Sequence, residues 1–119
     1  VVINSLSMLK AALSDQGKEK LALILEKGTK EYNINIVLAE QVKNISSVSF
    51  EKWYKANVSP SDGLWIGNGI TEQYQMKANK TTSEMHEDIT PEFGFSLIKG
   101  KCVKLKFLRN KAEEEEDDE

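Results

Sequence analysis

Two short apolar runs separated by an amphipathic segment constrain this fold more than any other feature of the sequence. The first run is Val1–Ile3, and the second covers residues 34–39. Between them, apolar residues recur at the spacing of one helix face: Leu21, Ile24, Leu25, Gly28 and Tyr32. Two parallel strands joined through a helix need a right-handed crossover. The sequence therefore predicts a βαβ unit whose continuously apolar strands are buried on both faces.

Two further short helices are expected beside this unit. Leu6, Leu9 and Leu13 are spaced for one helix face, and we expect the stretch from Asp15 to Gly17 to end that helix, with Asp15 capping the next one. A second short helix is predicted between residues 46–49 and Pro60. Its apolar face would carry Phe50, Trp53 and Tyr54.

The second half of the sequence predicts strands and turns. We expect a strand over residues 64–66, a turn at Gly67–Gly69, a second strand over residues 74–77 and a polar loop over residues 78–91. Residues 93–98 and 102–108 predict a closing hairpin around Lys99–Lys101. In its second strand Val103, Leu105 and Phe107 alternate with lysines.

The charge of the chain is uneven. The net charge is −3, but residues 113–119 are all acidic, and without them 16 basic and 12 acidic residues leave +4 over residues 1–112. We expect one domain over residues 1–112 and a disordered acidic tail over 113–119. A body of +4 does not favour nucleic-acid binding, and no apolar run is long enough to insert into a membrane. Because the chain opens directly in an apolar run, we expect it to be a piece of a longer one.

The residues offer little catalytic chemistry. His86 is the only histidine and Cys102 the only cysteine, and they lie in unlike segments, so a catalytic triad is nearly excluded and a Cys102–His86 dyad stays open. A lone cysteine fits the cytosol. Residues 84–88 predict a solvated charge cluster and no metal site. A P-loop string is absent, and Gly67–Gly69 is either a turn or a phosphate-binding loop.

The order of these features resembles the second half of an FtsK/SpoIIIE-type RecA-like ATPase module. In that family a strand ends in the Asp-Glu of Walker B, a helix follows, and a second strand ends in Ala-Thr-Gln before a Gly-x-Gly turn. Here Val1–Ser5, Ile36–Gln41 and Ile66–Gly69 stand at those places, and the resemblance covers residues 1–107. Asp62–Ile70, followed by Glu72-Gln73-Tyr74, is similar to the last ATPase module of EssC-type type VII secretion motors. The implied fold is α/β, a partial RecA-like P-loop NTPase with a parallel βαβ core and C-terminal β-hairpins.

Departures from the family motifs imply a degenerate module. Asn4 and Ser5 replace the Walker B carboxylates, and Glu40 replaces the family threonine before Gln41. Hydrolysis needs a carboxylate that holds the water shell of magnesium and one that polarises water. The resemblance therefore implies nucleotide-proximal positions at Asn4, Ser5 and Gln41 without catalysis, and no cofactor in this chain, with ATP and magnesium left to the parent protein.

The implied role is regulation of a type VII secretion motor or docking of WXG100-like secreted substrates. Its partners would be the upstream half of the same module and the other modules of a membrane-anchored, cytoplasmic motor. Docking of a helix needs exposed apolar side chains, and the candidates are Phe50, Trp53, Tyr54, Leu64 and Trp65. Burial in the core is the competing interpretation for all five, and we expect it for at least half of them. The alternative function is half of an active FtsK-type translocase of DNA or protein.

Overall fold

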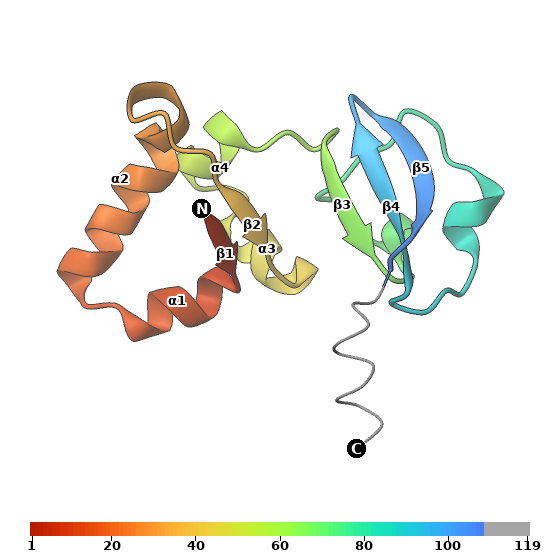
Figure 1. Cartoon of the computed structure of the whole chain (residues 1–119), viewed down its shortest axis with the longest axis horizontal. Coiled ribbons are helices and arrows are strands. Elements are labelled where there is room, and N and C mark those ends of the chain that lie inside the picture. The colour runs from red at the N-terminus through yellow and green to blue at the C-terminus, as the bar shows by residue number, and fades with distance from the viewer. Residues whose placement is uncertain (109–119) are drawn as a thin grey trace, which may run out of the picture. The chain divides into compact units, whose positions relative to one another are not determined.

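The computed structural model describes residues 1–108, which form two compact units (Figure 1). The first unit is Val1–Ser59 and the second starts at Pro60. The first contains a two-stranded parallel sheet and helices, and the second a three-stranded antiparallel sheet. The chain is thus mixed α/β, and the predicted acidic tail lies outside the described residues.

The first unit contains the predicted βαβ arrangement. Its elements are β1 (Val2–Asn4), α1 (Leu6–Ala12), α2 (Asp15–Glu31), β2 (Val37–Ala39), α3 (Val42–Val48) and α4 (Lys52–Asn57). Strands β1 and β2 are parallel, with Ile3 opposite Leu38. The crossover between them contains α1 and α2, so the prediction of parallel strands joined through a helix is confirmed.

The prediction that both faces of β1 and β2 are buried is wrong. Ile3 is 8% exposed and packs with Leu6, Leu21, Leu25 and Trp53, whereas Val2 and its partner Val37 are 71% and 60% exposed. Successive side chains of a strand point to opposite faces. The helices cover one face of this two-stranded sheet, so the apolar side chains on the other face remain exposed in the described chain.

The helix boundaries also differ from the prediction. Ser14, not Asp15, is the N-cap of α2, and its Oγ accepts a hydrogen bond from Gly17 N at 3.2 Å. Asp15 is the first helical residue, where a negative charge is favourable to the helix dipole. Helix α3 was not predicted. None of residues 42–48 is fully buried, so the segment lacks the clear apolar stripe from which a helix is predicted. Phe50 follows α3 and precedes α4, outside both.

The second unit consists of β3 (Gly63–Ile66), η1 (Ile70–Glu72), η2 (Ser83–His86), β4 (Phe93–Ile98) and β5 (Lys101–Lys106). The strand order is β3-β4-β5, and both pairs are antiparallel. The predicted hairpin is confirmed, with a two-residue turn in which Lys99 and Gly100 have φ of 52° and 83°. Two positive φ angles are the pattern of a type I′ turn. A Cβ at Gly100 would collide with the Asn79 side chain, so glycine is required there.

The strand predicted over residues 74–77 is wrong. The side chain of Gln73 forms hydrogen bonds with the backbone of this segment. Its Oε1 accepts from Gln75 N and from Met76 N, both at 2.8 Å. Its Nε2 donates to Ile70 O and Met76 O. A side chain thus forms the hydrogen bonds that a neighbouring strand would otherwise form.

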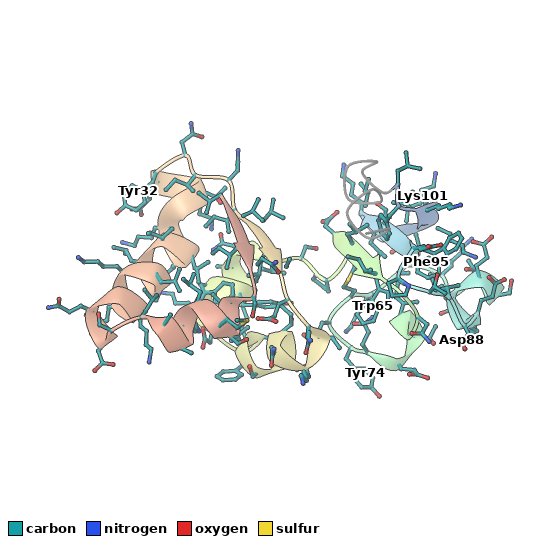
Figure 2. All side chains as sticks on the ribbon, turned by 60° about the horizontal axis from the view of Figure 1, so that its bottom comes forward. Tyr32, Trp65, Tyr74, Asp88, Phe95 and Lys101 are labelled. Atoms are coloured by element: carbon teal, nitrogen blue, oxygen red, sulfur yellow. The ribbon has the colours of Figure 1, made fainter. Side chains whose placement is uncertain are left out.

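The core of the second unit lies on one face of its sheet. Phe95 and Leu97 are each 1% exposed and pack with Ile70 and Met85. Trp65, opposite Phe95 on β3, packs against this core and is partly buried (Figure 2). On β5, Cys102 lies on the core side, so alternation places Val103 and Leu105 on the opposite, exposed face.

Candidate functional site

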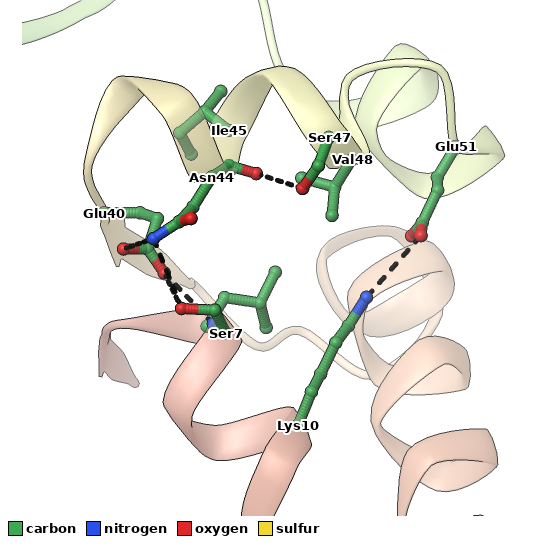
Figure 3. A pocket seen from close by; sticks show the side chains of 9 residues that line it. Ser7, Lys10, Glu40, Asn44, Ile45, Ser47, Val48 and Glu51 are labelled. Atoms are coloured by element: carbon green, nitrogen blue, oxygen red, sulfur yellow. Dashed lines mark hydrogen bonds and ion pairs between the residues drawn. The ribbon is translucent and has the colours of Figure 1, made fainter.

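The carboxyl ends of β1 and β2 form the rim of a cavity in the first unit. In α/β proteins ligands bind outside the carboxyl ends of parallel strands. Here Ser5 follows β1, Glu40 follows β2, and Ser5 N donates to Ala39 O at 2.7 Å. The adjacent cavity has a volume of about 340 Å³. Its lining comes from α1, α3 and the segments beside them: Leu6, Ser7, Lys10, Glu40, Asn44, Ile45, Ser47, Val48 and Glu51 (Figure 3).

The Glu40 carboxylate is the centre of a hydrogen-bond cluster on this rim. Oε2 accepts from Ser7 N at 3.0 Å, from Ser7 Oγ at 3.1 Å and from Ser5 Oγ at 3.3 Å. Oε1 accepts from Gln41 N at 2.9 Å and from Asn44 Nδ2 at 3.1 Å. Donors from α1, from α3 and from the two strand ends therefore converge on one carboxylate.

These donors change the acidity of Glu40. The backbone N–H of Ser7 is the largest cause, and with the Gln41 N–H and the Asn44 amide it lowers the pKa of Glu40 from 4.5 to about 2, against a smaller opposing effect of desolvation. Hydrogen bonds to a carboxylate favour its charged form. Glu40 is thus an anion at neutral pH and a poor general base, because a base works best with a pKa near the working pH.

An ion pair stands on the other side of the cavity (Figure 3). Lys10 Nζ lies 3.6 Å from Glu51 Oε1, and Glu51 also accepts a hydrogen bond from Trp53 Nε1. Lys10 and Glu51 are each about one-third exposed, so solvent weakens the attraction between them. Apolar side chains, including Leu6 and Val48, line the space between this pair and the Glu40 cluster.

Ser5 adopts an uncommon backbone conformation at this rim. Its φ of 67° lies in the left-handed region, which costs a non-glycine residue about 1 kcal/mol or more. Its hydroxyl accepts a hydrogen bond from Met8 N at 3.4 Å as the N-cap of α1, besides donating to Glu40. These contacts of the hydroxyl, together with the hydrogen bond from Ser5 N to Ala39 O, hold Ser5 in place.

The three positions predicted to lie near a nucleotide all fall at the strand ends. Ser5 and Gln41 both donate to Glu40, whereas Asn4 ends β1 with an exposed side chain. Ser7 and Asn44 were not predicted as site residues. The central role of Glu40, to which both donate, was also not predicted. An acid directly after the second apolar strand was the signal that could have identified this cluster.

The five predicted docking residues are divided between the two units and between core and surface. Trp53 is 6% exposed and belongs to the first core, where Tyr54 packs edge-on to it with ring centroids 5.6 Å apart. Phe50 and Leu64 are exposed, at 69% and 52%. Trp65 packs against the second core. Burial thus leaves Phe50 and Leu64 as the accessible apolar side chains of the set.

The Gly67–Gly69 turn and Cys102 are the remaining candidates from the sequence. In the turn, the backbone oxygen of Asn68 accepts a hydrogen bond from Trp65 Nε1 at 3.0 Å, and its side-chain amide donates one to Asp88 at 2.6 Å. Burial, and secondarily the charge of Glu84, raises the pKa of the Cys102 thiol, which works against a thiolate nucleophile.

Within residues 1–108, no three histidine, cysteine or carboxylate side chains gather as metal ligands. None of the helices in that range has the length and apolar character that a membrane span requires. A scan against protein-family models, a search of curated proteins and a search of solved structures found no match to this chain.

Proposed function

We propose that this chain is a non-hydrolysing binding module, the C-terminal half of a degenerate RecA-like ATPase domain in a type VII protein secretion motor. In this role it regulates the motor or docks small helical substrates of the WXG100 kind. It acts together with the upstream half of the same module, which would supply any contact to ATP and magnesium.

The observation that carries the proposal is the state of the carboxylate at the strand ends. Glu40 accepts five hydrogen bonds from its own chain, and its pKa is lowered to about 2. Its lone pairs are committed to the fold, which leaves it poorly suited to hold a magnesium water shell or to accept a proton. At the Walker B position Asn4 and Ser5 are neutral. This rim is therefore suited to joining the strands to α1 and α3, and not to hydrolysis.

The arrangement around the rim supports a binding role. The parallel strands β1 and β2 are joined through helices, as the resemblance implies, and their carboxyl ends border a cavity with an apolar floor. The exposed apolar side chains on both units, Phe50 and Leu64 among them, are of the type that contacts the apolar stripe of a partner helix.

The test is calorimetric titration of the chain, joined to the upstream half of its module, with magnesium-ATP and with a peptide from the C-terminal tail of a WXG100-like protein. We expect heat from the peptide and no phosphate release above the rate without protein. Steady ATP hydrolysis that falls in the Asn4→Ala variant would refute the proposal and support the active translocase.

A further inference from the structure

One face of the antiparallel sheet in the second unit carries mostly apolar side chains, several of them exposed. The hairpin register places Leu64 beside Ser96 and Ser96 beside Val103, and the next row contains Ile66, Gly94 and Leu105. We call this surface the outer face. Its members are Leu64, Ile66, Gly94, Ser96, Ile98, Lys101, Val103 and Leu105.

The exposure of the outer face is unusual for so small a unit. Leu64, Ile66 and Ile98 are 52%, 60% and 66% exposed, and Val103 is 46% exposed. Single exposed apolar residues are ordinary, but contiguous ones mark an interaction surface. The apolar side chains stand on adjacent rows of one sheet face, with Ser96 and Gly94 between those of β3 and those of β5.

The centre of the outer face carries small side chains. The central strand β4 contributes only Gly94 and Ser96 to the middle rows, whereas branched side chains stand on the strands at either side. A Cβ at Gly94 would meet the Phe107 ring, so Phe107 covers Gly94 on this face. Ser96, between Leu64 and Val103, is partly exposed.

The charge of the sheet selects the partner. The segment 93–106, which forms β4, β5 and their turn, contains Lys99, Lys101, Lys104 and Lys106 and no acidic residue. Lys101 belongs to the outer face, opposite Ile98. Lys104 and Lys106 lie on the core side, where both ammonium groups lie over the Phe93 ring and Lys104 Nζ is 2.9 Å from Glu87 Oε2. Lys101 is thus the lysine that the strands place on the outer face. A partner of the outer face therefore meets apolar side chains beside positive charge.

We propose that the outer face binds an amphipathic α-helix of a partner protein whose apolar stripe is flanked by acidic residues. Three strands at about 4.8 Å spacing span about 10 Å, which is the diameter of a helix with its side chains. Residues two apart on a strand lie about 6.7 Å apart, close to the i, i+4 separation of about 6 Å along a helix. An acidic flank would meet Lys101 and Lys99 at the turn.

A second copy of the chain fits the outer face less well. A stable interface involves about 20–30 residues on each side, many more than this face presents. Two copies would also bring two lysine-bearing surfaces together, which is unfavourable. This inference rests on the proposed docking function in one respect: that function proposes a helical partner.

The experiment measures fluorescence anisotropy of a labelled synthetic helix of about 15 residues, with a leucine stripe and glutamate flanks. The chain is compared with Leu64→Ser, with Val103→Ser and with the matched control Tyr74→Ser, which changes a side chain that is 86% exposed and outside the outer face. We expect Leu64→Ser and Val103→Ser each to weaken binding by about tenfold or more, and Tyr74→Ser to leave it unchanged. A peptide with lysine flanks should bind more weakly than the glutamate peptide.

Three outcomes would overturn the assignment. One is no binding of the glutamate peptide, and another is equal binding by the chain and Leu64→Ser when their circular dichroism spectra agree. The third is a concentration-dependent dimer that Leu64→Ser abolishes in sedimentation, which would assign the face to a second copy. A tail peptide from a WXG100-like protein, titrated in parallel, separates the two proposals. Tail binding that Leu64→Ser leaves intact would retain the docking function and reject the outer face, whereas binding of the synthetic helix alone would do the reverse.

Discussion

Replacement of Glu40 by glutamine should destabilise the first unit by an amount that depends on pH. The amide keeps one acceptor oxygen, but its NH₂ group faces backbone or side-chain donors that the second carboxylate oxygen now satisfies. The difference between a pKa of 4.5 and about 2 corresponds to roughly 3 kcal/mol at about 1.4 kcal/mol per pH unit. Glu40 is partly exposed, and screening by solvent reduces this to about 1–2 kcal/mol.

The sign of the pH dependence follows from the lowered pKa. A carboxyl group with a lower pKa in the folded state stabilises the protein above the unfolded pKa and loses that contribution as the pH falls through the folded pKa. The difference in unfolding free energy between the native chain and Glu40→Gln should therefore be constant above about pH 5.5. It should shrink from pH 4.5 toward pH 2, the range that the two pKa values define.

The two tryptophans allow the first unit to be measured alone. Trp53 lies in the first unit and Trp65 in the second, so in a Trp65→Phe background the fluorescence during urea unfolding reports the first unit. Glu19→Gln, an exposed change on α2, is the control and should change stability by less than about 0.5 kcal/mol. A carbon NMR titration that places the pKa of Glu40 near 4.5, or equal stability of Glu40→Gln and the native chain at pH 7, would refute the reasoning.

Three further predictions concern other parts of the chain. Gly94→Ala should destabilise the second unit by about 1–3 kcal/mol, since the added Cβ would overlap the Trp65 carbonyl oxygen; urea unfolding that matches the native chain would contradict this. Ser14→Ala removes the acceptor for Gly17 N and should cost about 1 kcal/mol, which Trp53 fluorescence would measure against Ser14→Asn, a conservative cap. Cys102 is partly buried, which raises its pKa; it should react with a disulfide reagent at pH 8 more slowly in the native chain than in urea, and equal rates would rule out this protection.

Local signals in the sequence predicted the elements that depend on neighbouring residues. The helical spacing of Leu21, Leu25 and Gly28 and the apolar runs on either side of that helix predicted the βαβ arrangement that the structure contains. The apolar runs on either side of Lys99–Lys101 predicted the hairpin, and the structure narrows its turn to Lys99 and Gly100, which both have positive φ angles.

Two of the incorrect predictions arose where a side chain took over hydrogen bonds from the backbone. Gln73 holds residues 75 and 76 through its amide, so an apparent strand became an irregular segment. Ser14 caps α2 although Asp15 is an equally good cap by composition. Several conformations satisfy such short polar stretches about equally well, and packing of the surrounding chain selects one.

The sequence by itself determined the parallel crossover and the closing hairpin, because periodicity and turn chemistry act over a few residues. Only the tertiary structure decided which face of each strand is covered and that donors from α1 and α3 converge on Glu40. Alternation along a strand defines two faces without saying which one is buried. The pKa of a carboxylate likewise depends on donors that are distant in sequence, and folding alone brings these groups together.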